Sequence, residues 1–287
     1  MGLHDRQNGT LFADASIFRC PVCGAPMAFA DDASKRLICE RRHSYDAGRW
    51  INFLTRPVSA YYGKALFEAR RRVWAAGFFD PLAVYLADIL SNSTIILDAG
   101  CGEGTPLIRT LENVTDRSEQ FRAVGVDLSR DAVRMASGLN KSVRWLVADL
   151  THLPLRDGAF DTVLNLLSPA CYEEFARVLM PGGRLVKVLP ESEHLCEIRE
   201  LLPKERISTL APRESVTDRL ESRFDIISAE RLTMRRRAPV GLKEPLVRMA
   251  PFYAHLRDTE CAELALSLGD EIRLDLSILT AVLRKAN

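Results

Sequence analysis

Short apolar runs alternate with amphipathic segments through the central part of the chain. The runs rich in Val, Ile and Leu, each of strand length, are residues 95–98, 121–127, 143–149, 160–167 and 184–189. Helical patterns with polar or proline starts separate most of these runs: one opens at Thr105-Pro106, and the others cover residues 129–136 and 172–179. Strands that alternate with helices predict an α/β fold with a parallel, doubly wound sheet.

Further elements are expected on both sides of this core. Residues 66–90 read as two helices, the second with Asp80 as its N-cap and Pro81 in its first turn. Near the C-terminus, Met249–Tyr253 and Ile272–Leu283 fit the sixth and seventh strands, with a helix between them. These two strands would complete a seven-stranded sheet.

Three glycines at alternate positions follow the first apolar run. Gly100, Gly102 and Gly104 come directly before Thr105 and Pro106, which are predicted as N-cap and first helical residue. Glycine allows a sharp turn and a close approach of the backbone to a ligand. A strand, a glycine turn and a helix N-terminus together predict a nucleotide-shaped pocket at the carboxyl edge of the sheet.

Acidic residues at strand ends refine this prediction. Asp127 ends the second strand, where a carboxylate can accept hydrogen bonds from both ribose hydroxyls of a nucleoside. Gly104 follows Gly102 by two residues rather than three, so the loop is not the dinucleotide fingerprint. Instead, Asp98-x-Gly-x-Gly-x-Gly followed by a strand-terminal acid resembles the S-adenosylmethionine site of class I methyltransferases. That ligand has no pyrophosphate, so Glu103 facing the pocket is tolerable.

The end of the third strand is expected to form the part of the pocket that binds adenine. Asp149 ends that strand, where its carboxylate can accept from the exocyclic amine. Leu128 and Leu150, which follow the second and third strand-terminal acids, complete this part of the predicted donor site.

Composition narrows the class of protein. The chain has 47% hydrophobic and 27% charged residues, as a soluble globular protein does. It lacks an apolar run of about 18 residues, and its N-terminus lacks a basic segment followed by an apolar core, so we expect a cytoplasmic protein with no membrane span. A net charge of +1 argues against a uniformly basic nucleic-acid binder, although local cationic clusters still matter.

The N-terminal part carries a metal-ligand spacing. Cys20, Cys23, Cys39 and His43 follow the pattern C-x2-C-x15-C-x3-H, which lies in the range of a tetrahedral Cys3His zinc site. Four protein ligands leave no open position, so the predicted zinc is structural. The alternative is a set of unlinked cysteines beside a surface histidine. Residues 44–54 are expected to form a short strand that closes this small lobe.

These motifs occur in one order along the chain and resemble one family. The motifs are the zinc knuckles, Phe-Glu-Ala-Arg-Arg, Ala-Gly-Phe-Phe-x-Pro-Leu, Leu-Asp-x-Gly-Cys-Gly-Glu-Gly and Ser-Pro…Glu-x-x-Arg-Val-Leu-x-Pro-Gly-Gly. Together they look like those of the bacterial 23S ribosomal-RNA guanine-N1 methyltransferases. Members of that family act on a hairpin loop of the large subunit. The resemblance covers about residues 18–202 and predicts a class I methyltransferase sheet with a small N-terminal zinc-binding domain.

The resemblance also implies residue roles. The four ligand residues named above would hold zinc, and Gly102, Glu103 and Asp127 would hold the methyl donor. Phe79 matches a position where some members place a tyrosine against the donor, so a hydroxyl contact is expected to be missing here. His194 matches a family histidine near the donor, with a surface histidine as the alternative. The implied domains are a leader and zinc lobe over 1–60, a helical connector over 61–94 and the methyltransferase domain over 95–287.

The implied reaction is methyl transfer from S-adenosylmethionine to N1 of a guanine. The acceptor base should arrive at the end of the fourth strand, at Asn165, Ser168 and the backbone of Pro169. The group that removes the N1 proton is not identified by the sequence.

Cationic and aromatic residues are candidates for contact with the RNA. The arginines expected to meet phosphates, with solvated surface as the alternative, are Arg70, Arg71, Arg72, Arg235, Arg236 and Arg237. Tyr61 and Tyr62 are candidates for stacking on an extruded base, with a core or loop-anchoring role as the alternative. Some relatives carry a longer basic segment where this chain has only residues 56–64, which puts the target nucleotide in question.

The sequence leaves open two other functions and the oligomeric state. A small-molecule methyltransferase would share the whole central domain. A non-catalytic RNA-binding protein on the same fold would lack donor binding. Either a monomer or a homodimer is compatible with the sequence.

Overall fold

The computed structural model describes residues 15–30, 35–56, 62–115, 121–201, 213–253 and 256–284. Within these residues, eight strands form one mixed sheet in the order β10-β11-β9-β8-β5-β6-β7-β4, and a three-stranded sheet β1-β2-β3 lies near the N-terminus. Strands β4 to β9 of the large sheet pair with one another in parallel, whereas β11 is antiparallel to both β9 and β10. The doubly wound class I methyltransferase fold expected from the sequence is confirmed.

The elements have the following bounds. The large sheet consists of β4 (Trp50–Asn52), β5 (Ile95–Ala99), β6 (Arg122–Asp127), β7 (Val143–Val147), β8 (Phe160–Leu166), β9 (Leu179–Pro190), β10 (Phe224–Arg237) and β11 (Glu271–Leu283). The small sheet consists of β1 (Met27–Phe29), β2 (Arg36–Cys39) and β3 (Ser44–Asp46). The helices are α1 (Lys64–Ala75), α2 (Asp80–Leu90), α3 (Thr105–Glu112), α4 (Arg130–Ala136), α5 (Tyr172–Val178), α6 (Cys196–Arg199), α7 (Arg213–Glu221), α8 (Val240–Met249) and α9 (Asp258–Ser267), with a 3-10 turn η2 (Pro251–Tyr253).

Most buried side chains form two large clusters on opposite faces of the large sheet, and Leu66, Phe67 and Ala132 form a small third one between α1 and α4. Successive residues of a strand point to opposite faces, and Ile96 and Leu97 accordingly belong to different clusters. Helices α1 to α4, α8 and α9 supply one cluster, whereas α5, α7 and the N-terminal residues supply the other. Because both faces are covered, the parallel strands are near-continuous apolar runs, as such strands usually are.

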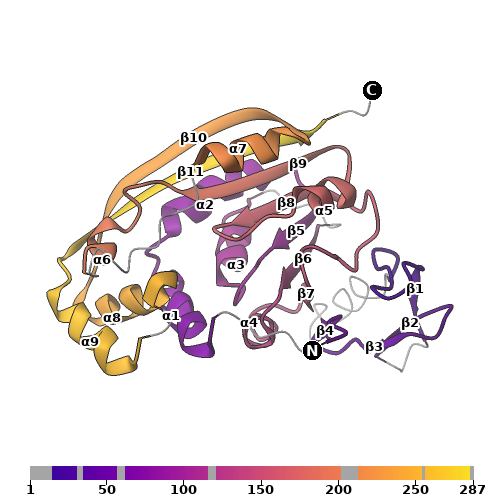
Figure 1. The fold of residues 1–287 in the computed structure, drawn as a ribbon, viewed down its shortest axis with the longest axis horizontal. Coiled ribbons are helices and arrows are strands. Elements are labelled where there is room, and N and C mark those ends of the chain that lie inside the picture. Colours follow the sequence, from indigo (N-terminus) through magenta and orange to yellow (C-terminus); the bar gives the residue numbers. More distant parts are fainter. Residues whose placement is uncertain are drawn as a thin grey trace.

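The N-terminal lobe (residues 15–30 and 35–49) covers part of the sheet where a helix is missing. Residues 148–159, which connect β7 to β8 and are described throughout, contain no helix. Phe18 forms a backbone bridge with Leu155 there, and the Arg19 N–H donates to the Pro154 carbonyl at 3.1 Å. In Figure 1 the small sheet of the lobe, in indigo, lies next to β4. The lobe is therefore part of the core of the sheet domain.

The expectation of one strand over residues 44–54 that closes the lobe was wrong in part. Residues 44–46 form β3 and pair with β2 in the small sheet. Residues 50–52 form β4, which pairs in parallel with β7 through Trp50 and Trp145. The seven strands of the expected fold thus gain an eighth at the edge, because Gly48 and its neighbours turn the chain from one sheet into the other.

Two predicted helix caps differ from the structure. Gly104, with φ of 83°, is the N-cap of α3, so Thr105 and Pro106 are its first two helical residues. The Thr105 hydroxyl donates to Glu103 instead of capping. Likewise, Phe79 is the N-cap of α2 and Asp80 its first residue, because the Asp80 carboxylate accepts from Arg109 at 2.8 Å.

The sixth strand is β10, not Met249–Tyr253 as the sequence suggested. Met249 ends α8 and residues 251–253 form η2, where the buried Tyr253 hydroxyl donates to the Ile198 carbonyl at 2.6 Å. The long strand β10 pairs along its length with β11, from Phe224 to Arg237. Its outward face is largely polar, which concealed a strand of 14 residues in the sequence. The seventh strand, β11, lies where it was expected.

No single helix in the described part of the chain has the length and apolarity needed to cross a membrane. Helices α1 and α2, which meet at an angle of 81°, pass that test only as a pair, by length and composition.

Candidate active site and metal centre

Three cysteines and one histidine converge in the N-terminal lobe. One ligand atom from each of Cys20, Cys23, Cys39 and His43 lies within 4.8 Å of the others. His43 Nδ1 is 3.5 Å from the Sγ atoms of both Cys20 and Cys39, and Cys23 Sγ is 3.7 Å from Cys39 Sγ. Tetrahedral zinc with ordinary Zn–S and Zn–N bonds would separate its ligand atoms by about 3.5–3.8 Å. The donor set and the spacing both fit a structural zinc ion.

Tight turns bring each pair of ligands together. The Gly24 N–H donates to the Cys20 carbonyl at 2.8 Å, with Gly24 at φ of 73°. In the second pair, the Arg42 N–H donates to the Cys39 carbonyl at 2.8 Å, and Arg42 has φ of 63°. One residue in a left-handed conformation therefore helps to reverse the chain at each ligand pair, Gly24 directly after the first pair and Arg42 within the second.

The glycine bend follows β5, as predicted. Gly100, Gly102 and Gly104 have φ of 85°, 55° and 83°, which L side chains rarely adopt. Packing adds a second requirement, since a Cβ on Gly100 would lie 1.9 Å from Ser168 Oγ and a Cβ on Gly104 would lie 2.6 Å from the Trp145 ring. The bend therefore turns the chain and also leaves room for the side chains of Ser168 and Trp145.

Asp127 lies directly beside this bend. Its Oδ2 accepts from the Gly102 N–H at 2.9 Å, and its Oδ1 accepts from the Ser129 N–H at 2.8 Å. A carboxylate offers about four acceptor positions, so two of them are not used by these backbone groups. The structure thus brings together the two features from which the nucleoside site was inferred.

Two further carboxyl groups are buried at the bend. Asp98 is 2% exposed, and burial, assisted by the charges of Asp127 and Glu103, raises its pKa to about 8. Burial also raises the pKa of Glu103, against hydrogen bonds from Thr105 and Arg71. Within the described residues, Asp98 Oδ1 and Glu103 Oε1 have no hydrogen-bond partner. Glu103, expected to face an open pocket, is instead 1% exposed. Buried acceptors without donors and excess negative charge fit a cationic ligand.

Two of the three consecutive arginines of α1 point toward these acids. Arg71 Nε lies 3.3 Å from Glu103 Oε2, and its Nη2 donates to the Glu103 carbonyl at 3.4 Å. The Arg70 guanidinium lies 5.4 Å from the centre of the Tyr62 ring, and its charge opposes the rise that burial causes in the pKa of Asp127. Arg72 is exposed and pairs with Glu244 at 3.6 Å. These cations compensate part of the negative charge at the bend.

The residues predicted to meet the acceptor base lie together at the end of β8. Asn165 is fully buried, and its Nδ2 donates to the carbonyls of Ala99 at 2.6 Å and Pro169 at 3.1 Å. Ser168 lies against Gly100. The structure therefore places this predicted acceptor loop next to the predicted donor loop.

Sequence reasoning missed Lys187, which belongs to the same group. Its ammonium donates to Asn165 Oδ1 and to the Ser168 carbonyl, and the residue is 4% exposed. Desolvation lowers the pKa of Lys187 to about 8. The signal was present in the run Leu185-Val186-Lys187-Val188-Leu189, because a lysine in the middle of a buried strand needs partners.

The other predicted donor residues are more widely spread. Phe79 is buried and stacks on Trp74 with 4.9 Å between ring centres. Leu128 and Leu150 are half-buried, and a Leu150 methyl lies 3.8 Å from where a Gly100 Cβ would be. Asp149 is exposed, and its Oδ1 accepts from both the Thr151 N–H and hydroxyl.

His194 follows β9 and contacts the antiparallel strand β11. Its Nδ1 accepts from the Asp275 N–H at 3.3 Å. Burial lowers the pKa of His194 to about 4, in spite of the nearby Asp275 charge, so the ring is neutral at physiological pH. The hydrogen bond that the structure gives His194 is therefore to a strand rather than to the glycine bend.

The arginines at the end of β10 differ in their surroundings. Arg235 is 61% exposed and lies 3.8 Å from both Glu197 and Glu271. Arg236 is half-buried and donates to the carbonyls of Gly77 and Phe78, so it fixes the turn between α1 and α2. Arg237 is exposed. Tyr61, the other candidate for base stacking, lies outside the described residues.

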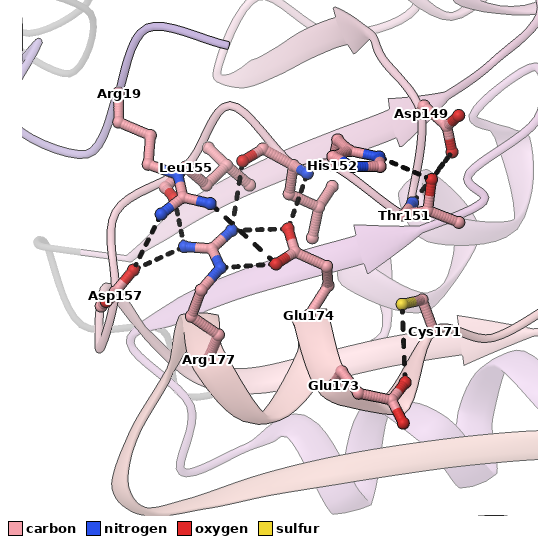
Figure 2. Close-up of polar contacts among 11 residues, drawn as sticks. Arg19, Asp149, Thr151, His152, Leu155, Asp157, Cys171, Glu173, Glu174 and Arg177 are labelled. Atoms are coloured by element: carbon pink, nitrogen blue, oxygen red, sulfur yellow. Dashed lines mark hydrogen bonds and ion pairs between the residues drawn. The ribbon is translucent and has the colours of Figure 1, made fainter. Parts of the chain in front are cut away.

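An ion-pair network joins the lobe to the loop that follows β7. Figure 2 shows Arg19 of the lobe and Arg177 of α5 around the carboxylates of Asp157 and Glu174. Arg177 also donates to the carbonyls of Leu153 and Leu155. Glu174 and Arg177 are the Glu-x-x-Arg of the family-like motif, and they fix the loop of residues 153–157, to which Arg19 of the lobe is paired through Asp157.

Comparisons with known proteins define the class and then the family. A methyltransferase domain model matches residues 96–183, which hold the glycine bend, Asp127 and the acceptor loop. YxjB of Bacillus subtilis, which is assigned to the 23S rRNA (guanine-N1)-methyltransferases, is 41% identical over 218 residues, 71% of this chain and 76% of that protein. The 23S rRNA (guanine(748)-N1)-methyltransferase of Streptomyces fradiae is 30% identical over 276 residues, 93% of this chain and 96% of that protein. The chain belongs to the family of 23S rRNA (guanine-N1)-methyltransferases.

Proposed function

We propose that this protein transfers the methyl group of S-adenosylmethionine to N1 of a guanine in a hairpin loop of 23S ribosomal RNA. The observation that carries the proposal is the extent of similarity to the Streptomyces fradiae enzyme, which covers 93% of this chain and 96% of that protein. That extent takes in nearly the whole chain, whereas the general methyltransferase model matches only residues 96–183. A small-molecule methyltransferase would need only the central domain.

The residues at the glycine bend fit the methyl donor. S-adenosylmethionine supplies a methyl group on a positively charged sulfur. The Asp127 carboxylate has acceptor capacity for the ribose hydroxyls beyond its bonds from the Gly102 and Ser129 N–H groups, and the partnerless oxygens of Asp98 and Glu103 suit a positive charge. The bend, with no Cβ at Gly102, lets the ligand approach the backbone.

The acceptor loop would hold the guanine against this donor. Asn165, Ser168 and Pro169 lie at the end of β8, and Ser168 contacts Gly100 of the bend. Methyl transfer requires the acceptor nitrogen and the methyl carbon to be about 3 Å apart on one line, and such positioning supplies much of the rate. A base in a hairpin loop is poorly stacked, so its extrusion costs only a few kcal/mol.

The N-terminal lobe is proposed to bind zinc and to grip the RNA without taking part in the chemistry. The Cys3His cluster has no open ligand position. Exposed cations surround the second knuckle, at Arg41, Arg42 and Arg49. Together with Arg72, Arg235 and Arg237, which are also exposed, they are candidates for contact with phosphates.

Donor affinity should depend on pH through Asp98. Its pKa is about 8 because of burial and the neighbouring Glu103 and Asp127 charges, and the ionised form suits a cationic ligand. Affinity for S-adenosylmethionine should therefore rise between pH 5.5 and 7.5, by up to about tenfold per unit, as one proton leaves per molecule bound. Calorimetry in buffers of different ionisation enthalpy measures both the affinity and the number of protons released on binding.

Asp98→Asn is the control for this pH dependence. It should bind more weakly, with a flatter pH profile. Because an acid with a raised pKa destabilises the folded state as pH rises toward that pKa, the variant should also melt at a higher temperature than the parent at pH 8. A wild-type affinity that is constant over this range would contradict the role of Asp98.

The substrate is tested by mapping the product on RNA. Unmodified 23S rRNA and its isolated hairpins are incubated with labelled S-adenosylmethionine, and reverse transcription locates the product, because a methyl on N1 blocks base pairing. We expect one labelled guanine in a hairpin loop, and position 748, named for the Streptomyces fradiae enzyme, is the first to examine. Donor binding without any labelled guanine would favour a small-molecule acceptor, and absence of donor binding would favour a non-catalytic RNA-binding protein.

A further inference from the structure

Lys187 is a buried cation in the middle of the sheet. It lies on β9 and is 4% exposed, between the apolar residues Val186 and Val188. Burial of a lysine is unfavourable unless its ammonium has partners. Both of its described partners, Asn165 Oδ1 and the Ser168 carbonyl, belong to the end of β8 and the loop that follows it.

Asn165 extends this contact to the donor side. Its Nδ2 donates to the carbonyl of Ala99, the last residue of β5, at 2.6 Å, and to the Pro169 carbonyl at 3.1 Å. One continuous set of hydrogen bonds therefore runs from β9 through β8 to the start of the glycine bend and to the acceptor loop. We call Lys187, Asn165 and the Ser168 and Pro169 carbonyls the lysine latch.

The loop held by the latch is strained. Leu167 has φ of 50°, in the left-handed region that leucine avoids. Such a conformation persists only when surrounding contacts enforce it. Leu167 is fixed from one side by its own N–H, which donates to the Val188 carbonyl at 3.1 Å, and from the other by the bond of Lys187 to Ser168.

This strained conformation sets the distance between the two loops. Ser168 follows Leu167 and contacts Gly100 so closely that any side chain at Gly100 would clash with it. Leu167 itself is 39% exposed, so packing of its side chain does not account for the conformation. The hydrogen bonds of the latch, together with the bond from the Leu167 N–H to the Val188 carbonyl, hold the acceptor loop against the glycine bend.

We propose that Lys187 is a positioning residue for methyl transfer, which keeps the loop of residues 167–169 in its strained form so that the acceptor base meets the donor at a fixed separation. The inference rests on the proposed function for the identity of the acceptor. Lys187 acts through Asn165 and the loop and is not assigned contact with either substrate.

The first test is Lys187→Met, which keeps a long unbranched side chain, one atom shorter than that of lysine, and removes its hydrogen bonds. We expect kcat for RNA methylation to fall about 30-fold to 100-fold, because misplacement by about 1 Å costs that much. The donor Kd should change less than about threefold, since Asp127 and the glycines are intact. Hydrogen exchange of peptides spanning residues 166–171 should accelerate at least tenfold, a readout that does not depend on which acceptor is methylated.

Two further variants separate positioning from general stability. Thr162→Val removes the buried hydrogen bond to Ser93 from the other end of the same strand β8, so it should lower the melting temperature while kcat stays unchanged. Leu167→Gly accepts the left-handed conformation without strain, so it should keep the melting temperature and still lower kcat, because glycine also allows other conformations. If Lys187→Met does not fold, Leu167→Gly still tests whether the fixed conformation of the loop is needed for methyl transfer.

The outcomes distinguish the inference from the proposed function. If the wild-type protein methylates no guanine, the proposed function fails, while the exchange measurement still tests the latch. If Lys187→Met and Leu167→Gly retain wild-type kcat, or if Lys187→Met leaves exchange at residues 166–171 unchanged, the latch is overturned. Loss of donor binding in parallel with kcat would also overturn it, since the role would then be support of the donor site.

Discussion

Replacement of Asp127 by alanine should weaken binding of S-adenosylmethionine by about 100-fold or more. The proposed hydrogen bonds from two ribose hydroxyls to a carboxylate are charge-assisted, and each contributes about 1.5–3 kcal/mol. The variant also releases the Gly102 N–H, which shapes the bend. Isothermal titration calorimetry with S-adenosylmethionine measures the loss.

The matched control is Asp131→Asn, an exposed acid in the first turn of α4. It should bind the donor as the wild-type protein does. Zinc content, measured by mass spectrometry, should be the same in Asp127→Ala, Asp131→Asn and the wild type, because the metal cluster lies in the N-terminal lobe. Equal donor affinity in Asp127→Ala and wild type would show that the donor site is misplaced.

Replacement of Cys39 by serine should release the metal and destabilise the whole molecule. Structural zinc contributes on the order of 10 kcal/mol to small domains that it organises. The lobe buries Phe18 in the same cluster as Leu97 and Phe160 of the large sheet, so its unfolding also exposes the sheet. We expect the melting temperature to fall by about 10 °C or more, with loss of RNA affinity.

Metal analysis and thermal melting test this prediction, and Cys196→Ser serves as the control. Cys196 lies in α6, outside the cluster, and is a free, half-buried thiol. Its replacement should leave both zinc content and melting temperature unchanged. A zinc chelator should reproduce the effect of Cys39→Ser in the wild-type protein. Retention of one tightly bound zinc by Cys39→Ser would refute the proposed ligand set.

Local patterns predicted the parallel part of the fold well. Strands β5 to β8, which are short apolar runs between turn residues, and the glycine bend with Asp127 at the next strand end are local signals. Both were found where expected because burial on both faces of a parallel sheet leaves a continuous apolar run in the sequence. The metal cluster was equally predictable, since two short turns impose the spacing of its four ligands along the sequence. In contrast, β9 begins at Leu179, before the expected run of residues 184–189 and at the end of the segment expected to be helical.

Features that depend on long-range contacts were not predictable in this way. β10 has a polar outer face and owes its length to pairing with β11, from Phe224↔Leu283 to Arg237↔Glu271. β4 looks like an extension of the lobe and becomes a strand of the large sheet only through β7. Glu103 appeared free to face a ligand, but Arg71 and Thr105 bind it. Lys187 acquires a role only when β9 lies next to the end of β8.

Because the N-terminal lobe covers part of the sheet, the chain cannot be shortened to the methyltransferase domain without exposing buried residues. A shortened chain that starts at α1 would retain every residue of the glycine bend and of the acceptor loop. It would nevertheless uncover Leu153 and Leu155, which are now buried against Phe18, and would leave β7 as an unpaired edge open to other molecules. Such a fragment should self-associate rather than act as a minimal enzyme, so the metal lobe and the methyltransferase sheet form one folding unit.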